Sequence, residues 1–483
     1  MVSKDGVSGR TPVMGWNSWN AYRCDINETR VLDAAKELIT YGLKELGYVY
    51  VNIDDCWSIP NTRDPETLAI IPDPAKFPHG IKWLADQIHA LGLKLGIYGD
   101  AGETTCAGFP GSLYFEEIDA RTWAEWGVDY LKYDNCNVPS SWPSDPYHNC
   151  HPDYNSPHGP NATCINDPLL APPGYDWSTS PTAERFMRMS EALDKQNRTI
   201  LLSLCEWGQA GVAEGWGEEV SISWRLTDDI FPRWPVIKHI ANYASFFSHS
   251  VAFFAHNDLD MLEIGNGNLT LAEQRTHFSL WAALKSPLLI GTDISALSPA
   301  ALAILKNHAL IAFNQDPKIA APAQPFNWNW EYNDDLPAAY WSGRGQEGVM
   351  VLLVNWHEKE WGMGVSWGEV PELVQGKGYK VKNGWTGEEL GCWKGWEGMV
   401  EKHDTVVLVV GEECEGLAKS MPLFATLPAS NSRISSKKLE YLKEMAAKEG
   451  PAPGVVGDVK AYRQEDVQVV DAGDTMELKE DSE

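Results

Sequence analysis

Short apolar runs alternate with helix-like stretches along the first three hundred residues of the chain. In the helix-like stretches apolar residues recur three or four positions apart, as Val31, Ala34, Leu38 and Leu46 do in residues 28–46. The apolar runs are bounded by Gly or polar residues, which is typical of strands. The runs cover residues 11–19, 48–53, 93–98, 128–134, 199–204, 220–224, 251–255 and 287–290, and the helix-like stretches cover 28–46, 81–91, 118–126, 183–193, 236–247, 271–284 and 297–307.

Eight strands that alternate with helices predict an α/β fold with parallel strands and right-handed crossovers. The length of the repeating region fits one (β/α)8 TIM barrel over residues 10–314. An open doubly wound sheet is the alternative fold, but the sequence has no GxGxxG turn after the first strand and no Walker motif. The barrel is interrupted by a long insertion, residues 138–181, which is rich in Pro, Ser and Asn.

The pattern changes after Asp316. Short β-branched runs at residues 348–354, 378–381 and 405–410 are separated by Gly- and Trp-rich turns. This spacing predicts a small antiparallel β-sandwich over residues 318–415. Residues 416–483 lack a sustained core pattern and end in an acidic stretch, so we predict a mostly disordered tail.

Charge and composition narrow the possible partners and the compartment. The chain has 483 residues and a formal net charge of -28, which argues against nucleic acid or an anionic membrane as a partner. The 22 Trp residues offer faces that suit sugar C–H surfaces, although most Trp residues serve packing. Nine Cys and sequons at Asn27, Asn161, Asn197 and Asn268 favour a secreted glycoprotein. The polar N-terminal segment lacks an apolar signal core, which leaves a cytosolic protein as the alternative.

Carboxylates collect where the predicted strands end. Because the carboxyl ends of barrel strands surround one catalytic face, we expect these side chains to line one pocket. Few cations accompany them, which fits a neutral polyhydroxylated ligand. A metal site is the alternative, but no HExxH pair or EF-hand loop is present. The strand-end residues are Asp54, Asp55, Asp100, Asp134, Glu206, Arg225, Asp229 and Asp260.

Two of these carboxyls would supply the nucleophile and the acid that glycoside hydrolysis needs. Lys132 and Asp134 are two residues apart on one strand and should project to the same face. A cation beside a carboxylate lowers its pKa, so Asp134 suits the ionised role, although a structural ion pair explains the same pattern. A second Asp less compensated by cations suits the proton donor. Spacing alone does not choose among Asp228, Asp229, Asp260 and Glu206.

Several sequence blocks resemble α-galactosidases of glycoside hydrolase family twenty-seven. They appear in the order of that family, across about residues 10–320. The blocks are Met14-Gly15-Trp16-Asn17-Ser18-Trp19, Ile53-Asp54-Asp55-Cys56-Trp57, Lys94-Leu95-Gly96-Ile97-Tyr98, Cys106-Ala107-Gly108-Phe109-Pro110-Gly111-Ser112, Leu131-Lys132-Tyr133-Asp134, Cys205-Glu206-Trp207, Trp224-Arg225 with Asp229-Ile230, and Asn314-Gln315-Asp316.

The resemblance implies a retaining hydrolase of terminal α-D-galactosyl residues that uses no cofactor and no metal. Asp134 would be the nucleophile and Asp229 the acid and base, about 5–5.5 Å apart as in retaining enzymes. The substrate would be a small or oligosaccharide α-galactoside; the resemblance defines neither the natural galactoside nor an oligomeric state. The implied substrate-binding residues are Trp19, Asp54, Asp55, Tyr98, Cys106, Lys132, Glu206, Arg225 and Asp260.

The resemblance also implies two disulfides, Cys24–Cys56 and Cys106–Cys136. From the insertion we add Cys150–Cys164, and Cys392 and Cys414 are candidates for a pair in the sandwich. Some relatives pair the Cys before the Glu-Trp block with a Cys upstream of the Trp-Arg block. Here Ser221 and Ser223 stand in that region, so we predict that Cys205 is a free thiol.

Three other functions compete with this reading. An α-N-acetylgalactosaminidase needs room for an acetamido group at the 2-position of the sugar, which the long charged side chain of Glu206 would crowd. A non-catalytic sugar-binding barrel would be expected to lack Asp134 or Asp229, and both are present. A metal-dependent hydrolase would be inhibited by a chelator, and we predict no such inhibition.

Overall fold

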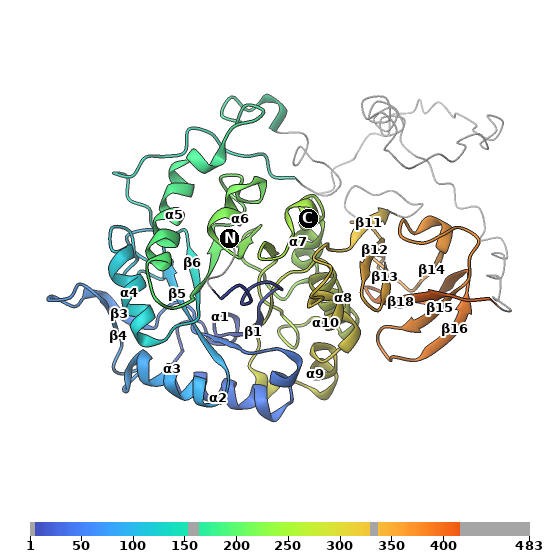
Figure 1. Ribbon diagram of the computed structural model, residues 1–483, viewed down its shortest axis with the longest axis horizontal. Helices are drawn as coiled ribbons and strands as arrows, with labels where there is room; N and C mark the ends of the chain where they lie inside the picture. The colour runs from blue at the N-terminus through green and yellow to red at the C-terminus, as the bar shows by residue number, and fades with distance from the viewer. Residues whose placement is uncertain (1–4, 153–163, 329–336, 416–483) are drawn as a thin grey trace, which may run out of the picture. The chain divides into compact units, whose positions relative to one another are not determined.

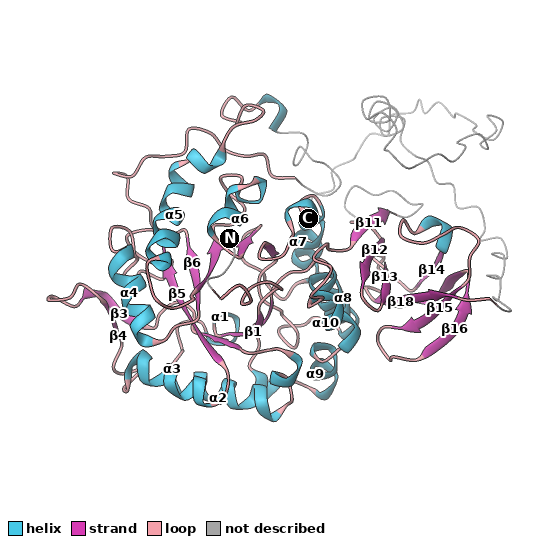
Figure 2. Cartoon of the chain, viewed as in Figure 1, coloured by secondary structure: helices cyan, strands magenta, loops and turns pink. Residues whose placement is uncertain are grey.

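The computed structural model describes residues 5–152, 164–328 and 337–415. An eight-stranded parallel sheet forms the centre of its N-terminal part (Figures 1 and 2), with the order β10-β1-β2-β5-β6-β7-β8-β9. A parallel bridge between Leu262, just after β9, and Ile290 in β10 joins the two ends of this order. The predicted (β/α)8 barrel is confirmed. Its strands are β1 (Met14–Asn17), β2 (Tyr50–Asn52), β5 (Lys94–Asp100), β6 (Tyr130–Asp134), β7 (Leu201–Cys205), β8 (Ser223–Arg225), β9 (His256–Asp258) and β10 (Leu288–Ile290).

Helices follow the barrel strands and lie around them (Figure 2). Their starts are marked by local capping: Asn27 accepts from Arg30 N at the start of α2, and Thr270 and Glu273 form a capping box at the start of α8. The helices are α1 (Trp19–Tyr22), α2 (Glu28–Thr40), α3 (Gly80–Ala90), α4 (Glu116–Trp126), α5 (Pro181–Asp194), α6 (Trp216–Val220), α7 (Trp234–Ser245), α8 (Leu271–Ala283), α9 (Pro299–Leu305) and α10 (His308–Asn314). None of the helices in the described ranges is long and apolar enough to cross a bilayer.

Strand β6 shows how the barrel separates its two faces. Leu131 and Tyr133 pack into the large core between sheet and helices, whereas Tyr130 belongs to a small cluster with residues of other barrel strands. Side chains two apart share a face, so Lys132 and Asp134 continue the inward row that Tyr130 begins. The inner cluster, which closes the barrel interior below the strand ends, consists of Val13, Tyr50, Tyr130, Leu201, Ile222, Met261 and Leu289.

One predicted strand and two predicted helices differ from the structure. The helix predicted over residues 28–46 ends at Thr40. The apolar run 251–255 forms a tight turn in which Ala252 and Ala255 exchange backbone hydrogen bonds and Phe254 has a φ of 64°. The barrel strand at this position is instead β9, whose residues are polar. It forms a strand because it pairs with β8, and its own sequence does not have a strand pattern. The predicted helix 297–307 ends early, because Asn307 caps a separate helix, α10. A hairpin of β3 (Ser58–Arg63) and β4 (Ile70–Pro72) was not predicted.

The C-terminal part is an antiparallel β domain, as predicted. Its larger sheet has the order β11-β12-β13-β18-β15-β16 (Figure 1). Strand β14 pairs with β17 in a second sheet. The predicted tail, residues 416–483, lies outside the described residues. The strands are β11 (Gln324–Asn327), β12 (Tyr340–Gly345), β13 (Gly348–Val354), β14 (Trp361–Ser366), β15 (Tyr379–Asn383), β16 (Glu389–Trp393), β17 (Gly395–Val400) and β18 (Thr405–Glu413).

All four expected disulfides are present: Cys24–Cys56, Cys106–Cys136, Cys150–Cys164 and Cys392–Cys414. The prediction that Cys205 is a free thiol is also confirmed, and the residue is buried. Burial raises the pKa of this thiol well above its ordinary value, so it stays protonated and is a poor nucleophile.

Candidate active site

Asp134 ends strand β6, and its carboxyl is buried and hydrogen bonded. Oδ2 accepts from the Tyr98 hydroxyl at 2.8 Å, and Oδ1 accepts from the Asn135 backbone N–H at 2.9 Å. Burial raises the pKa of Asp134, and Lys132 and the Tyr98 hydroxyl act in the opposite direction. The expectation that Lys132 lowers the pKa of Asp134 below its ordinary value is therefore wrong. Burial dominates because the strand end is 6% exposed and the ammonium pairs with another carboxylate.

That other carboxylate belongs to Asp54. Lys132 Nζ lies 2.9 Å from Asp54 Oδ2, which also accepts from Asn17 Nδ2 at 2.8 Å. Burial disfavours the charge of Lys132, but the nearby carboxylates of Asp54 and Asp134 raise its pKa well above its ordinary value. The ion pair thus joins the loop after β2 to strand β6, across the intervening strand β5.

Asp55 faces a separate set of donors. Its carboxyl accepts from the Thr105 hydroxyl at 2.9 Å, from Ala107 N at 3.0 Å and from Cys56 N at 2.6 Å. Burial raises the pKa of Asp55, and these hydrogen bonds oppose that shift. The contacts hold the segment around Cys106 against the end of β2, so Asp55 organises a loop of the site.

Asp229 has a different environment from Asp134. Its side chain is half exposed, and Oδ1 lies 3.1 Å from Arg225 Nη2. Partial burial acts to raise the pKa of Asp229, but Arg225 and then Lys132 bring it below its ordinary value. The expectation that the second Asp is the less compensated one is therefore wrong for Asp229. The tertiary fold places the guanidinium of Arg225 directly on it.

Arg225 is a fully buried cation that joins several carboxylates. Its Nη2 lies 3.0 Å from Asp260 Oδ2 as well as 3.1 Å from Asp229 Oδ1. Burial would lower the pKa of Arg225, yet Asp260 and its other anionic neighbours raise it. Asp260 adopts a φ of 74°, and its Oδ2 also accepts from Ile230 N at 2.8 Å. The β8 and β9 ends are thereby tied together.

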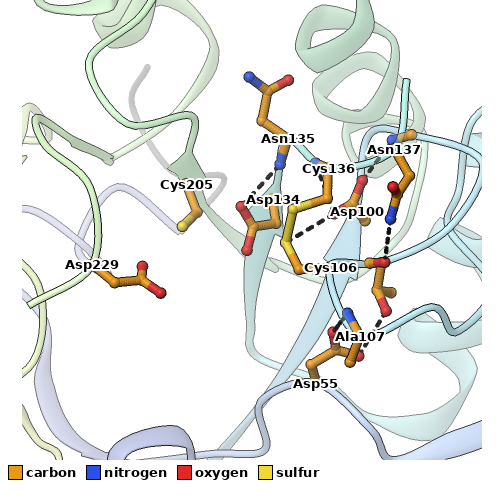
Figure 3. The surroundings of a disulfide bond; sticks show 12 residues. Asp55, Asp100, Cys106, Ala107, Asp134, Asn135, Cys136, Asn137, Cys205 and Asp229 are labelled. Carbon is orange, nitrogen blue, oxygen red and sulfur yellow. Dashed lines mark hydrogen bonds between the residues drawn. A yellow bond between two sulfur atoms is a disulfide. The ribbon is translucent and has the colours of Figure 1, made fainter. Parts of the chain in front are cut away.

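The two cations show that the carboxyls share one electrostatic environment. Lys132 and Arg225 both act on the pKa of Asp134, and the same two cations act on Asp229 and on Asp260. Figure 3 shows the Asp229 side chain pointing toward Asp134. Two carboxyls of which one is buried against a hydroxyl and the other is held by a guanidinium form a pair that can divide proton and nucleophile roles.

Glu206 follows β7 and is fully buried. Its Oε1 accepts from Gly208 N at 3.2 Å, and its Oε2 has no hydrogen-bond partner among the described residues. Burial raises the pKa of Glu206 well above its ordinary value. A buried carboxyl with an unused oxygen beside a cation is suited to a hydroxyl of a ligand, which both donates and accepts.

The Cys106–Cys136 disulfide lies beside Asp134, and Figure 3 shows this neighbourhood. Asp100 Oδ2 accepts from Cys136 N at 3.1 Å, and burial together with the Asp134 charge raises the pKa of Asp100 well above its ordinary value. Ligand atoms of Asp100, Cys106, Asp134 and Cys136 lie within 4.8 Å of one another. The sulfurs are bonded to each other, however, and a disulfide does not supply the thiolates that metal ions bind. The donor set does not fit a metal.

The rim of the site contains Trp19, the first residue of α1. The guanidinium of Arg23 stands over the Trp19 ring, 5.1 Å from its centroid, and contributes to lowering the pKa of Asp229. The predicted site residues thus fall into three connected groups. Lys132, Asp54, Tyr98 and Cys106 accompany Asp134; Arg225 and Asp260 accompany Asp229; and Glu206 and Asp55 lie on adjoining loops, with Trp19 at the start of α1.

Sequence reasoning did not assign Asn17 or Arg23 to the site, whereas Asp100 was among the strand-end residues expected there. Asn17 ends strand β1, so the strand-end rule that found the carboxylates applies to it as well. Arg23 follows a four-residue helix and has a φ of 50°. No local pattern marks it, because its place beside Asp229 depends on how α1 packs at the barrel mouth.

Two family models match the chain, and together they cover both parts of the fold. The model described as alpha galactosidase A matches residues 11–155 and 173–316. The model described as alpha galactosidase C-terminal beta sandwich domain matches residues 335–410. The first of these alone covers more than half of the chain.

Curated relatives and solved structures agree with these models. Proteins named "Probable alpha-galactosidase B" are 53% identical over 426 residues in Aspergillus fumigatus and 52% identical over 431 residues in Talaromyces emersonii. They cover 85% and 86% of this chain, and 95% of each relative is covered. Among solved structures, α-galactosidase I from Mortierella vinacea has a TM-score of 0.72 at 33% identity, over 84% of this chain and 98% of that one. The Saccharomyces cerevisiae α-galactosidase with raffinose has a TM-score of 0.71 at 27% identity, over 85% and 99%.

A closed barrel with opposed carboxyls at its strand ends, together with these relatives, defines a glycoside hydrolase. Within this class the chain belongs to the alpha-galactosidase A family.

Proposed function

We propose that this protein is a retaining α-galactosidase that removes terminal non-reducing α-D-galactosyl residues from neutral galactosides. The observation that carries the proposal is the pairing of a buried Asp134 with an Arg225-bound Asp229 in one electrostatic environment. The names of the relatives support the substrate class, and one related structure is described with raffinose. The predicted separation of the two carboxyls, about 5–5.5 Å, remains part of the proposal.

Asp134 is the nucleophile in this proposal. Its carboxylate attacks the anomeric carbon while the bond from that carbon to the leaving oxygen breaks, which gives a covalent glycosyl-enzyme. The Tyr98 hydroxyl, 2.8 Å from Oδ2, and Lys132 favour the ionised form that attack requires. The backbone N–H of Asn135 fixes the orientation of the other oxygen.

Asp229 is the acid and then the base. In the first step it gives its proton to the leaving oxygen, and in the second it takes a proton from the water that attacks the anomeric carbon and releases Asp134. Arg225 lowers the pKa of Asp229 in the free site, so substrate binding has to weaken this pair before Asp229 holds a proton. A sugar hydroxyl at the 2-position that accepts from Arg225 would have that effect, because it competes for the same Nη2.

The remaining predicted residues bind the galactosyl ring. Asp54 and Lys132 form one polar edge, Asp55 and Cys106 stand on an adjoining loop, and Trp19 offers an aromatic face. In this proposal Glu206 and Arg225 lie toward the 2-position, and Asp260 completes the ring of contacts around the sugar. The buried carboxyl of Glu206 occupies space that an acetamido group would need, which favours galactose over N-acetylgalactosamine.

The proposal extends to domain limits and compartment. We place the catalytic barrel at residues 10–314, because β1 begins at Met14 and α10 ends at Asn314, and the β-sandwich at residues 318–415. Four disulfides favour a secreted protein, since such bonds persist in oxidising compartments. The sequon residues Asn197 and Asn268 are exposed, as glycosylation requires, while Asn161 lies outside the described residues.

Hydrolysis of nitrophenyl α-galactoside followed by NMR of the first-formed sugar tests substrate and stereochemistry together. A retaining enzyme releases α-galactose first; β-galactose as the first product would refute the mechanism. Asp134→Ala should lower kcat by at least about 10⁴-fold without loss of folding. Asp86→Ala, an exposed position in α3, is the matched control and should retain wild-type turnover.

A further inference from the structure

A cavity of about 320 Å³ lies beside the loops that carry Glu206 and Asp229. Its size is at the lower end of the range of about 300–1,000 Å³ that is usual for ligand sites. Four separate segments build it: the insertion after β6, the loop after β7, the loop after β8, and helix α7. The lining residues are His151, Pro152, Trp207, Gln209, Leu226, Thr227, Asp228, His239 and Tyr243.

One wall of the cavity is formed by the loop that carries Asp229, the acid and base of the proposed reaction. Arg225 Nη2 donates to Thr227 O at 3.1 Å and to Asp229 Oδ1 at the same distance. Asp228, in the wall, precedes Asp229, and Trp207 follows Glu206. In a retaining mechanism the acid stands next to the leaving oxygen, so the sugar chain beyond the broken bond departs on the side of Asp229. Thr227 and Asp228, which line the cavity, belong to the same loop as Asp229, so the cavity borders the loop that carries the acid.

The walls of the cavity are held together by contacts among themselves. Gly208 sits so close to the next loop that an added Cβ would lie 2.0 Å from Leu226 O, and Asn149 Nδ2 donates to Gly208 O at 3.0 Å. His151 Nδ1 and the Tyr243 hydroxyl are 2.5 Å apart, which joins the insertion to α7. A cavity with walls fixed in this way is formed before any ligand arrives.

The lining suits a neutral hydroxylated ring. Trp207 and Tyr243 supply aromatic surface, while Gln209 and Asp228 are exposed polar groups that can accept from hydroxyls. The lining contains no Lys or Arg. Burial lowers the pKa of His151, so this imidazole is neutral at neutral pH and adds no site for an anion.

We propose that this cavity binds a hexose unit of the leaving group, so that the protein prefers α-galactosides whose leaving group contains at least two sugar units. The inference rests on the proposed function, because it uses Asp229 to define the leaving-group side. It assigns the described part of the insertion, through His151 and Pro152, a role in recognising the substrate beyond the galactosyl ring.

Substrates of increasing length test the inference. Melibiose has a monosaccharide leaving group and raffinose a disaccharide one, whereas nitrophenyl α-galactoside has no second sugar. Removing one aromatic contact corresponds to about 3- to 10-fold in kcat/KM. We expect Trp207→Ala to lower kcat/KM for raffinose by about this factor and to leave the other two substrates within about twofold. Gln209→Ala should show the same selectivity to a smaller extent, and Gln209 lies two residues further along the chain from Glu206 than Trp207 does.

Gln375→Ala, exposed in the β domain, is the matched control and should change none of the three substrates. An equal fall on all three substrates, or an unchanged ratio of raffinose to melibiose, would overturn the inference. A direct measurement does not depend on turnover: saturation-transfer NMR with sucrose, the leaving group of raffinose, should show contact in the wild type that Gln209→Ala weakens. No contact in the wild type would also overturn it. Absence of nitrophenyl galactoside hydrolysis would instead refute the proposed function.

Discussion

The hydroxyl of Tyr98 donates to Asp134 Oδ2 at 2.8 Å, and both groups are buried at the ends of neighbouring strands. Burial and the surrounding carboxylates hold the pKa of Tyr98 well above its ordinary value, so it keeps its proton and remains a donor. The same burial raises the pKa of Asp134. The hydrogen bond therefore favours the ionised form of Asp134, whereas burial favours its protonated form.

Tyr98→Phe should shift the acid limb of the pH profile. Attack requires ionised Asp134, so activity is present above its pKa and is lost as the pH falls through it. Removing the Tyr98 hydroxyl raises that pKa, and the acid limb of log kcat/KM should move to higher pH by about one unit. Tyr48→Phe removes a buried hydroxyl that bonds to Leu305 O away from the site, and it should leave the profile in place. An acid limb that stays where it is in Tyr98→Phe would contradict the assignment of Asp134.

Asp229→Ala should discriminate between leaving groups. Nitrophenolate leaves without protonation, whereas a sugar alcohol does not, so the loss of the acid should be larger on melibiose than on nitrophenyl α-galactoside. We expect the two losses in kcat/KM to differ by roughly 10²-fold or more. Added azide should restore turnover on the nitrophenyl substrate, because it attacks the glycosyl-enzyme without a base. Asp86→Asn, an exposed position in α3, is the control and should change neither substrate. Equal losses on both substrates would argue against an acid role.

Glu206→Ser should alter discrimination at the 2-position. The substitution removes a fully buried carboxyl and opens space where its unpartnered Oε2 lies in the described structure. We expect kcat/KM for nitrophenyl α-galactoside to fall by about 10-fold or more, since a hydrogen bond to a hydroxyl is lost. Hydrolysis of the corresponding N-acetylgalactosaminide should rise in the same variant. Glu206→Gln keeps the volume and should show no such rise. A wild type that already prefers the acetamido substrate would refute the choice of galactose.

Glu263 should make stability depend on pH near neutrality. Its Oε1 accepts from Asn20 Nδ2 at 2.5 Å, which connects it to the helix that begins with Trp19. Burial raises the pKa of Glu263 to about 7. A carboxyl with a raised folded-state pKa stabilises the fold fully below its ordinary pKa, and that contribution is lost as the pH rises through about 7.

Glu263→Gln removes the titration, so between pH 5 and pH 8 the wild type should lose about 2–3 kcal/mol of unfolding free energy relative to the variant. Urea unfolding at the two pH values measures this difference. The variant also loses a hydrogen-bond acceptor at every pH, so the readout is the pH slope and not the absolute stability. Glu125→Gln, exposed in α4, should keep the wild-type slope. Parallel slopes for wild type and Glu263→Gln would contradict the prediction.

The barrel could be predicted from the sequence because the pattern that indicates each strand and each helix lies within that element. Alternating apolar runs and helical spacing mark each β–α unit, and the connectivity of such units forces the strand ends to one face. This is why Asp54, Asp134 and Asp229 could be placed near one another without coordinates. The strand β9 escaped the same reasoning, because its residues are polar and only its neighbours make it a strand.

The sequence by itself determined which residues stand at the strand ends, because the spacing of apolar residues and the order of strands and helices can both be recognised in it. Only the tertiary structure decided how those residues are charged. Burial at the end of β6 outweighs Lys132 on Asp134, and Arg225 reaches Asp229 instead of leaving it uncompensated. Desolvation and ion pairing act through space and depend on every element packed around a group, so no local pattern specifies them.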